Sequence, residues 1–161
     1  MSQINSILLI DDETLFHLVF EDACSLLDIT LNLESVNTAE EAEKMFKNYY
    51  EGHSGKPECV FVDLNIIGSA FDGIELVRRI NHVYGNGVVI GIISSSSDEI
   101  EMEWAKSAGA QFWIVKSHEI EPRLESFKRD LEGYKSRNLD FRVYAWKRLS
   151  WAEKMKINSL R

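Results

Sequence analysis

Five short apolar runs recur along the chain, and longer stretches with helical spacing separate them. The runs span residues 7–10, 31–36, 59–62, 88–93 and 112–115. Most of them are apolar throughout, which is typical of strands in a parallel sheet that helices cover on both sides. The alternation therefore predicts an α/β fold with a five-stranded parallel sheet.

The segments between the runs carry apolar residues three and four positions apart, as amphipathic helices do. They predict helices over residues 14–27, 38–49, 73–83, 98–108 and 119–131. Thr38 and Glu41 form a capping-box pattern at the start of the second helix. Gly109 is a typical stop for the fourth helix, and Pro122 falls in the first turn of the fifth, where proline is tolerated.

The size and composition are those of an ordinary globular protein. A chain of 161 residues with 45% hydrophobic and 27% charged residues predicts about one domain. No run of 18 apolar residues exists, so we expect no membrane insertion, and the start of the chain lacks the basic region of a signal peptide. Its two cysteines predict neither a disulfide scaffold nor a zinc site. We expect a cytoplasmic protein.

Charge divides the chain into an acidic body and a basic tail. Residues 1–134 carry 10 Lys/Arg against 24 Asp/Glu, whereas residues 135–161 carry 8 against 2. An acidic body repels nucleic acid, so we do not expect nucleic acid as a partner of the body. We place a boundary here, with one domain over residues 1–133 and a basic, aromatic, helical extension over 134–161.

Polar side chains follow four of the five predicted strands. Asp11 and Asp12 follow the first, Asp63 the third, Ser94 the fourth and Lys116 the fifth. Ligands of open parallel sheets bind at the carboxyl ends of the strands, so we expect these side chains to gather at one edge.

The residue types at this edge suit phosphoryl transfer. Clustered carboxylates repel one another, and a divalent cation such as Mg²⁺ relieves that repulsion. A carboxylate can also accept a phosphoryl group as a nucleophile, while a cation and a lysine neutralise the charge on the phosphoryl oxygens. The sequence therefore predicts transfer of a phosphoryl group to Asp63.

Each of these residues also has an ordinary structural role when it is taken alone. An aspartate after a strand is often a turn former or a helix cap, and a lone lysine is usually a surface residue. Four independent coincidences at four strand ends are harder to accept. The "GHSGKP" segment lacks the spacing of a phosphate loop, and the four histidines are scattered along the chain.

The chain, over roughly residues 5–133, resembles the receiver domain of bacterial two-component response regulators. The resemblance lies in "LLIDDE", "VFVDLN", "VIGIISSSSDE" and "AGAQFWIVKS". It implies a flavodoxin-like sheet of order 2-1-3-4-5 with helices on both faces. The serine-rich stretch and the lack of room for an output domain look most like the small single-domain regulators that serve phytochrome-type kinases.

The resemblance also implies a role for each site residue. Asp63 would accept the phosphoryl group, and Lys116 would bind it. Asp12, Asp63 and the backbone carbonyl of Asn65 would hold Mg²⁺, with Asp11 close by. Other implied roles are those of the switch residues Ser94 and Trp113 and of Asn65 and Ser96, which would set the phosphate lifetime.

The implied partners are a histidine kinase or phosphotransfer protein as donor and a downstream protein target, with a homodimer as a further option. The chain would be a phosphoacceptor with self-catalysed transfer and dephosphorylation rather than an enzyme. A phosphoryl group would pull Ser94 inward and draw Trp113 into the space behind it.

Two departures from the family pattern keep other functions open. The loop after Asp63 is about two residues longer than usual, and Ser117 stands where a proline usually follows the lysine, which leaves a cis peptide there in question. The rival is a pseudo-receiver, a protein-interaction module that works without phosphorylation. An aspartate-based phosphatase is disfavoured because Asn65 stands where such enzymes place their general acid.

Overall fold

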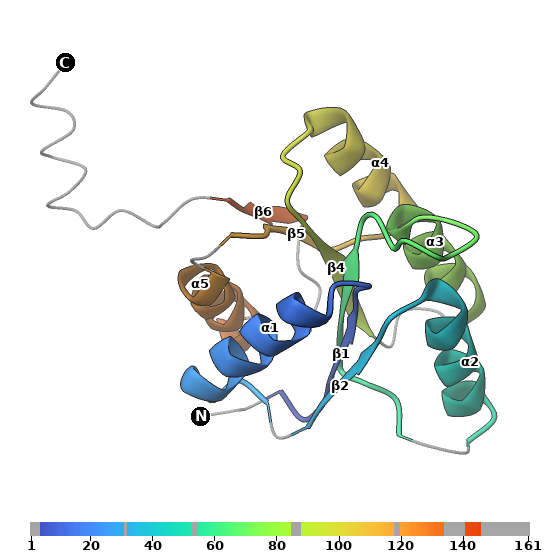
Figure 1. Cartoon of the computed structure of the whole chain (residues 1–161), viewed down its shortest axis with the longest axis horizontal. Coiled ribbons are helices and arrows are strands. Elements are labelled where there is room, and N and C mark those ends of the chain that lie inside the picture. The colour runs from blue at the N-terminus through green and yellow to red at the C-terminus, as the bar shows by residue number, and fades with distance from the viewer. Residues whose placement is uncertain are drawn as a thin grey trace, which may run out of the picture.

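The computed structural model of the chain describes residues 4–30, 32–52, 55–84, 88–117, 120–133 and 141–145. Strands and helices alternate along these residues, as the sequence predicts (Figure 1). In chain order the elements are β1 (Ile7–Ile10), α1 (Thr14–Leu26), β2 (Leu33–Val36), α2 (Ala39–Tyr50), β3 (Cys59–Asp63), α3 (Gly73–Tyr84), β4 (Val89–Ser94), α4 (Glu99–Ala108), β5 (Phe112–Val115), α5 (Ile120–Gly133) and β6 (Arg142–Tyr144).

The strands form one parallel sheet in the order β2-β1-β3-β4-β5-β6. The first five strands have the predicted order 2-1-3-4-5, so the flavodoxin-like expectation is confirmed. Within the described residues the sheet has six strands where the sequence predicts five, because β6 pairs in parallel with β5 through residues 142–144. The expectation of helix is wrong for these three residues, and the rest of the extension lies outside the described residues.

Helices cover both faces of the sheet. The helices α1 and α5 pack together on one face, and α2, α3 and α4 form the layer on the other (Figure 1). Side chains alternate between the two layers along each strand, so that Leu8 and Ile10 belong to the α2–α4 side and Ile7 and Leu9 to the α1–α5 side. This two-sided burial explains why the strand sequences are apolar throughout.

Aromatic rings in tilted and edge-to-face contact fill the α1–α5 side of the core. Their centroids lie 4.5–5.8 Å apart in a chain that ends on β6, made of Phe20, Phe61, Phe112, Phe127 and Tyr144. Gly91 of β4 faces this cluster, since a Cβ atom there would lie 2.5 Å from the ring of Phe112. Glycine at this position therefore makes room for the ring.

The predicted helix signals are present. The Thr38 side chain accepts a hydrogen bond from the Glu41 N–H at 3.2 Å at the start of α2. Gly109 ends α4 with a φ of 108°, the left-handed region that glycine favours. Within the described part of the chain, no helix is long and apolar enough to cross a membrane.

Candidate functional site

Three carboxylates meet at the carboxyl ends of β1 and β3. Asp11 and Asp12 follow Ile10, and Asp63 is the last residue of the adjacent strand, where Ile10 pairs with Val62. One carboxylate oxygen from each aspartate lies within 4.8 Å of the others. Asp11 and Asp63 are buried and Asp12 is half-buried. The register of the parallel strands thus brings together residues that are 51 and 52 positions apart.

Lys116 supplies the positive charge of the cluster. It follows the last residue of β5, and its backbone N–H donates to the Ser94 carbonyl oxygen at 2.8 Å. Its Nζ lies 2.7 Å from Asp11 Oδ2, 3.4 Å from Asp63 Oδ2 and 3.6 Å from Glu13 Oε1. Among the described residues no hydrogen bond is recorded for the buried Asp11 Oδ2, so its negative charge depends on this ion pair for stabilisation. The peptide bond between Lys116 and Ser117 is trans.

The burial of these charges shifts their titration. Burial first, and then repulsion from Asp11 and Asp12, raises the pKa of Asp63 to about 7, although the attraction of Lys116 opposes the shift. For Lys116, burial lowers the pKa, but the surrounding carboxylates outweigh burial and raise the pKa overall. One ammonium group therefore does not fully compensate three clustered carboxylates.

The turn after β1 holds Asp11 in place. Its Oδ1 accepts the Glu13 N–H at 2.8 Å, and His17 Nε2 lies 2.5 Å from its carbonyl oxygen. Glu13 itself contacts Lys116 and was not singled out from the sequence. Its position directly after the acidic pair was the only signal that could have found it.

The side chains of Ser94 and Trp113 both form hydrogen bonds with the backbone of Ser96. The Ser94 hydroxyl, which is buried, accepts the Ser96 N–H at 3.1 Å. The Trp113 ring is fully buried, and its Nε1–H donates to the Ser96 carbonyl oxygen at 3.1 Å. The Ser96 hydroxyl donates to Glu101 at 3.0 Å and accepts the Asp98 N–H at 3.2 Å. Ser96 thus connects the end of β4 to both β5 and α4.

Asn65 opens the loop between β3 and α3, and its side chain is exposed. The base of this loop is closed by a hydrogen bond from the Gly73 N–H to the Leu64 carbonyl oxygen at 2.8 Å. A Cβ atom on Gly73 would lie 2.1 Å from the Asp63 carbonyl oxygen. Glycine is therefore required where α3 starts against the backbone of Asp63.

The donor set fits a hard divalent cation. Mg²⁺ binds through oxygen and is usually held by one or two carboxylates together with waters and phosphate oxygens. The three clustered aspartates offer such oxygens, and they carry more negative charge than Lys116 balances. The site thus suits Mg²⁺ on the chemistry of its donors.

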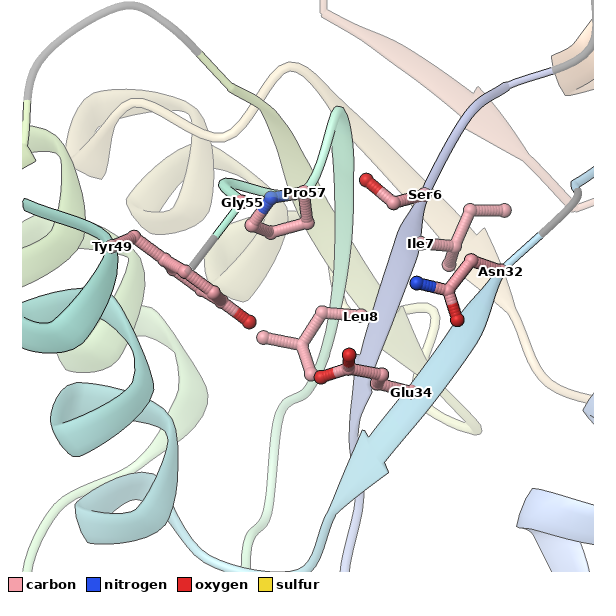
Figure 2. A pocket seen from close by; sticks show the side chains of 8 residues that line it. All are labelled: Ser6, Ile7, Leu8, Asn32, Glu34, Tyr49, Gly55 and Pro57. Atoms are coloured by element: carbon pink, nitrogen blue, oxygen red, sulfur yellow. The ribbon is translucent and has the colours of Figure 1, made fainter. Parts of the chain in front are cut away.

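A hollow lies beside the amino ends of β1 and β2 (Figure 2). Its volume is about 20 Å³, which is room for one water molecule. Burial, and then the Glu34 carboxylate, raises the pKa of Tyr49 to about 12. The hollow is remote from the acidic cluster, because it lies at the amino ends of β1 and β2. Its lining residues are Ser6, Ile7, Leu8, Asn32, Glu34, Tyr49, Gly55 and Pro57.

The fold and the site define a class, namely flavodoxin-like α/β proteins with an acidic cluster at the carboxyl ends of the strands. A family model described as the response regulator receiver domain matches residues 7–126. The chain belongs to this family. A comparison with curated proteins finds no match.

Several solved structures share the fold at low sequence identity. The phosphorylated cyanobacterial phytochrome response regulator RcpA is 19% identical with a TM-score of 0.66, over 84% of this chain and 96% of that one. Response regulator RPA3017, in red light signaling of R. palustris, is also 19% identical with a TM-score of 0.68, over 83% and 96%. NtrX from Brucella abortus is 21% identical with a TM-score of 0.68, over 99% of this chain and 30% of that one.

Proposed function

We propose that this receiver accepts a phosphoryl group on Asp63 from a phosphohistidine, in a reaction that requires Mg²⁺. The observation that carries the proposal is the position of Asp63. Its carboxylate is buried at the end of a central strand, beside two further carboxylates, with the Lys116 ammonium 3.4 Å away. These are the groups that a carboxylate nucleophile and the arriving phosphoryl group require.

In the proposed reaction an oxygen of Asp63 attacks phosphorus. The new P–O bond forms as the P–N bond of the phosphohistidine breaks, and the electron pair of that bond returns to the imidazole nitrogen. Lys116 moves from balancing carboxylates to balancing phosphoryl oxygens, and the Ser94 hydroxyl donates a hydrogen bond to one of them.

Asp12, Asp63 and the backbone carbonyl of Asn65 would hold Mg²⁺, with Asp11 beside them. The ion, when bound, neutralises charge on the phosphoryl oxygens and favours the ionised form of Asp63. That second effect matters because burial and Asp11 raise the pKa of Asp63 to about 7, and a protonated carboxyl is a poor nucleophile. The acidic neighbours of Asp63 thus attract the cation that activates it.

The exposed apolar side chains of α1 are where we propose that the phosphohistidine donor docks. Leu15 is 78% exposed, Leu18 57% and Val19 43%, and α1 begins two residues after Asp12. A donor that places its imidazole at Asp63 must cover the surface beside the mouth of the site. Three exposed aliphatic residues at helical spacing favour an apolar helical surface as the partner.

We propose that the output surface of the switch lies on residues 98–131. Ser96 connects Ser94 to this surface through its hydrogen bonds with α4 and Trp113. Because the Ser96 hydroxyl is engaged with Glu101 and Asp98, its proposed influence on phosphate lifetime is indirect. Trp113 is already buried here, so the proposed signal is a rearrangement around Ser96 rather than the inward movement of an exposed ring.

The deciding experiment measures phosphoryl incorporation from acetyl phosphate by intact mass. The wild-type chain with Mg²⁺ should gain one phosphoryl group, and the gain should vanish with EDTA and in Asp63→Ala. Asp72→Ala is the matched control. Asp72 caps α3, and its substitution removes the same charge from a position outside the cluster. If the wild type gains no phosphoryl group, the chain is better explained as a phosphorylation-independent interaction module.

A further inference from the structure

We propose that the first turn of α2 positions the loop between β3 and α3 through a latch, defined here as the contacts of Ser69 and Glu40, and thereby sets the affinity of the site for Mg²⁺. The inference rests on the proposed function, since it concerns the same cation. It adds positioning residues that lie outside the acidic cluster and on a different element.

The latch consists of two hydrogen bonds between segments that are 30 residues apart. The Ala39 N–H at the start of α2 donates to the Ser69 hydroxyl at 2.9 Å. The Ala70 N–H of the loop donates to Glu40 Oε1 at 2.8 Å. Each segment therefore supplies one backbone donor and one side-chain acceptor. Accepting the Ala70 N–H is also the leading cause of a lowered pKa for Glu40.

The latch completes the cap of α2. The first N–H groups of a helix have no partners within the helix. In the described part of the chain the Thr38 hydroxyl accepts the Glu41 N–H and not the Ala39 N–H. The Ala39 N–H therefore needs another acceptor, and the loop supplies it through Ser69. Moving the loop breaks both hydrogen bonds, and the cost is greater for the part-buried Ala39 N–H than for the exposed Ala70 N–H, which water can reach.

Arg79 of α3 forms a second contact with the loop. The Arg79 guanidinium of α3 lies 3.8 Å from the centre of the Phe71 ring, and the same side chain reaches Glu43 of α2 at 3.1 Å. Both sides of the loop are thus tied to helices, while Ile67 at its tip is 78% exposed.

The latch connects to the site through a short path of backbone. Ser69, which accepts from α2, also donates its own N–H to the Ile66 carbonyl oxygen at 3.2 Å. Ile66 is buried and directly follows Asn65, whose carbonyl is the proposed backbone ligand of Mg²⁺. A latched loop therefore presents this carbonyl in one place. An unlatched loop would have to be ordered when the cation binds, which weakens binding.

The test measures Mg²⁺ binding to the full chain by isothermal titration calorimetry. The double variant Glu40→Ala/Ser69→Ala should raise the Kd for Mg²⁺ by roughly three- to tenfold, which is at or below the lower limit of what outer-shell changes cost metal sites, because the latch acts through the backbone of the loop. Glu40→Gln keeps an oxygen acceptor for Ala70 and should bind within about twofold of the wild type, although it removes the same charge. Glu41→Ala is the control on the same turn, because its carboxylate turns towards Asn37.

Hydrogen exchange of residues 65–71 without metal provides a second readout. The double variant should exchange faster there while its circular dichroism stays that of the wild type. An unchanged Kd in the double variant, with a wild type that binds Mg²⁺ and is phosphorylated, overturns the latch and leaves the proposed function standing. Equal weakening in Glu40→Gln and the double variant would assign the effect to charge and also overturn it. A wild type that binds no Mg²⁺ overturns both.

Discussion

Asp63 lies in surroundings that disfavour the ionised form of its side chain. A carboxylate with only 5% of its surface exposed and two acidic neighbours is costly to ionise. The strand that ends in Asp63 is buried on both faces, and we therefore interpret the acidic residue at its end as a functional residue and not as a source of stability. Active sites commonly carry charge arrangements that the rest of the fold has to offset.

The first prediction concerns stability against pH without metal. The folded pKa of Asp63, about 7, lies above the value near 4 of an unfolded aspartate. Between these values the folded protein holds a proton that the unfolded chain releases, so the stability contributed by this group falls as pH rises from about 4 to 7. The loss is on the order of 2–4 kcal/mol, because one pKa unit is worth about 1.4 kcal/mol.

Urea unfolding in EDTA at several pH values measures this effect. Asp63→Asn should flatten the decline and be more stable than the wild type at pH 8, and Mg²⁺ should stabilise the wild type more than the variant. Parallel pH profiles for the two proteins would show that Asp63 is not the group responsible.

The second prediction concerns Lys116. Lys116→Met removes the cation that lies 2.7 Å from the buried Asp11 Oδ2, whose negative charge depends on this ion pair for stabilisation. Breaking one side of a buried ion pair costs roughly 3–5 kcal/mol, so the variant should be strongly destabilised at pH 8 in EDTA. The deficit should shrink on addition of Mg²⁺, which can replace the lost charge. Thermal unfolding followed by circular dichroism tests this, and equal melting temperatures at pH 8 would contradict it.

The sequence indicates much of this site because parallel strands impose a simple rule. Residues that follow buried strands share one edge of the sheet, so Asp11, Asp63 and Lys116 could be expected to lie near one another before any distance was known. The same rule has nothing to say about Glu40 and Ser69. These two belong to a helix start and a loop, and their contact depends on how the longer loop folds over α2.

At the scale of elements, the local signals account for the helices and most strands. Thr38 and Gly109 act as the caps that their residue types predict, because capping depends on neighbours a few positions away. The strand β6 gave no such signal. It is three residues long, and the whole of α5 separates it in sequence from its partner β5. No local periodicity could therefore reveal it.

The third prediction concerns the junction of β4, β5 and α4. Trp113→Phe keeps an aromatic ring in the core but removes the N–H that the Ser96 carbonyl accepts. We expect a loss of roughly 1–2 kcal/mol in the free energy of unfolding and faster hydrogen exchange in residues 95–98. Trp104→Phe is the matched control, since Trp104 is 58% exposed. Unchanged exchange in residues 95–98 would show that Trp113 does not hold this loop.

At the scale of the whole molecule, β6 changes one edge of the receiver sheet. It covers β5, and its Tyr144 continues the aromatic core onto Phe127 with ring centroids 5.8 Å apart. Asp130 of α5 fixes the strand, accepting hydrogen bonds from the Tyr144 hydroxyl and from Arg142, each at 2.7 Å. Residues 142–144 of the basic extension therefore pack against the folded body, and the domain boundary after residue 133 stays a prediction.

The last prediction tests whether β6 is integral to the fold. Tyr144→Ala uncovers Phe127 and removes a ring whose residue is only 6% exposed, so we expect a loss of roughly 2–4 kcal/mol, near the range for large-to-small changes in cores. Tyr144→Phe keeps the ring and loses only the hydroxyl bond to Asp130, which should cost about 1 kcal/mol.

A strand released from β5 also exposes an unpaired edge, which favours association between chains. Urea unfolding should therefore rank the proteins wild type, Tyr144→Phe, Tyr144→Ala, and light scattering should show concentration-dependent association for Tyr144→Ala above that of the wild type. If Tyr144→Ala unfolds at the same urea concentration as the wild type, β6 contributes nothing to the core and the receiver is stable with β5 as its edge.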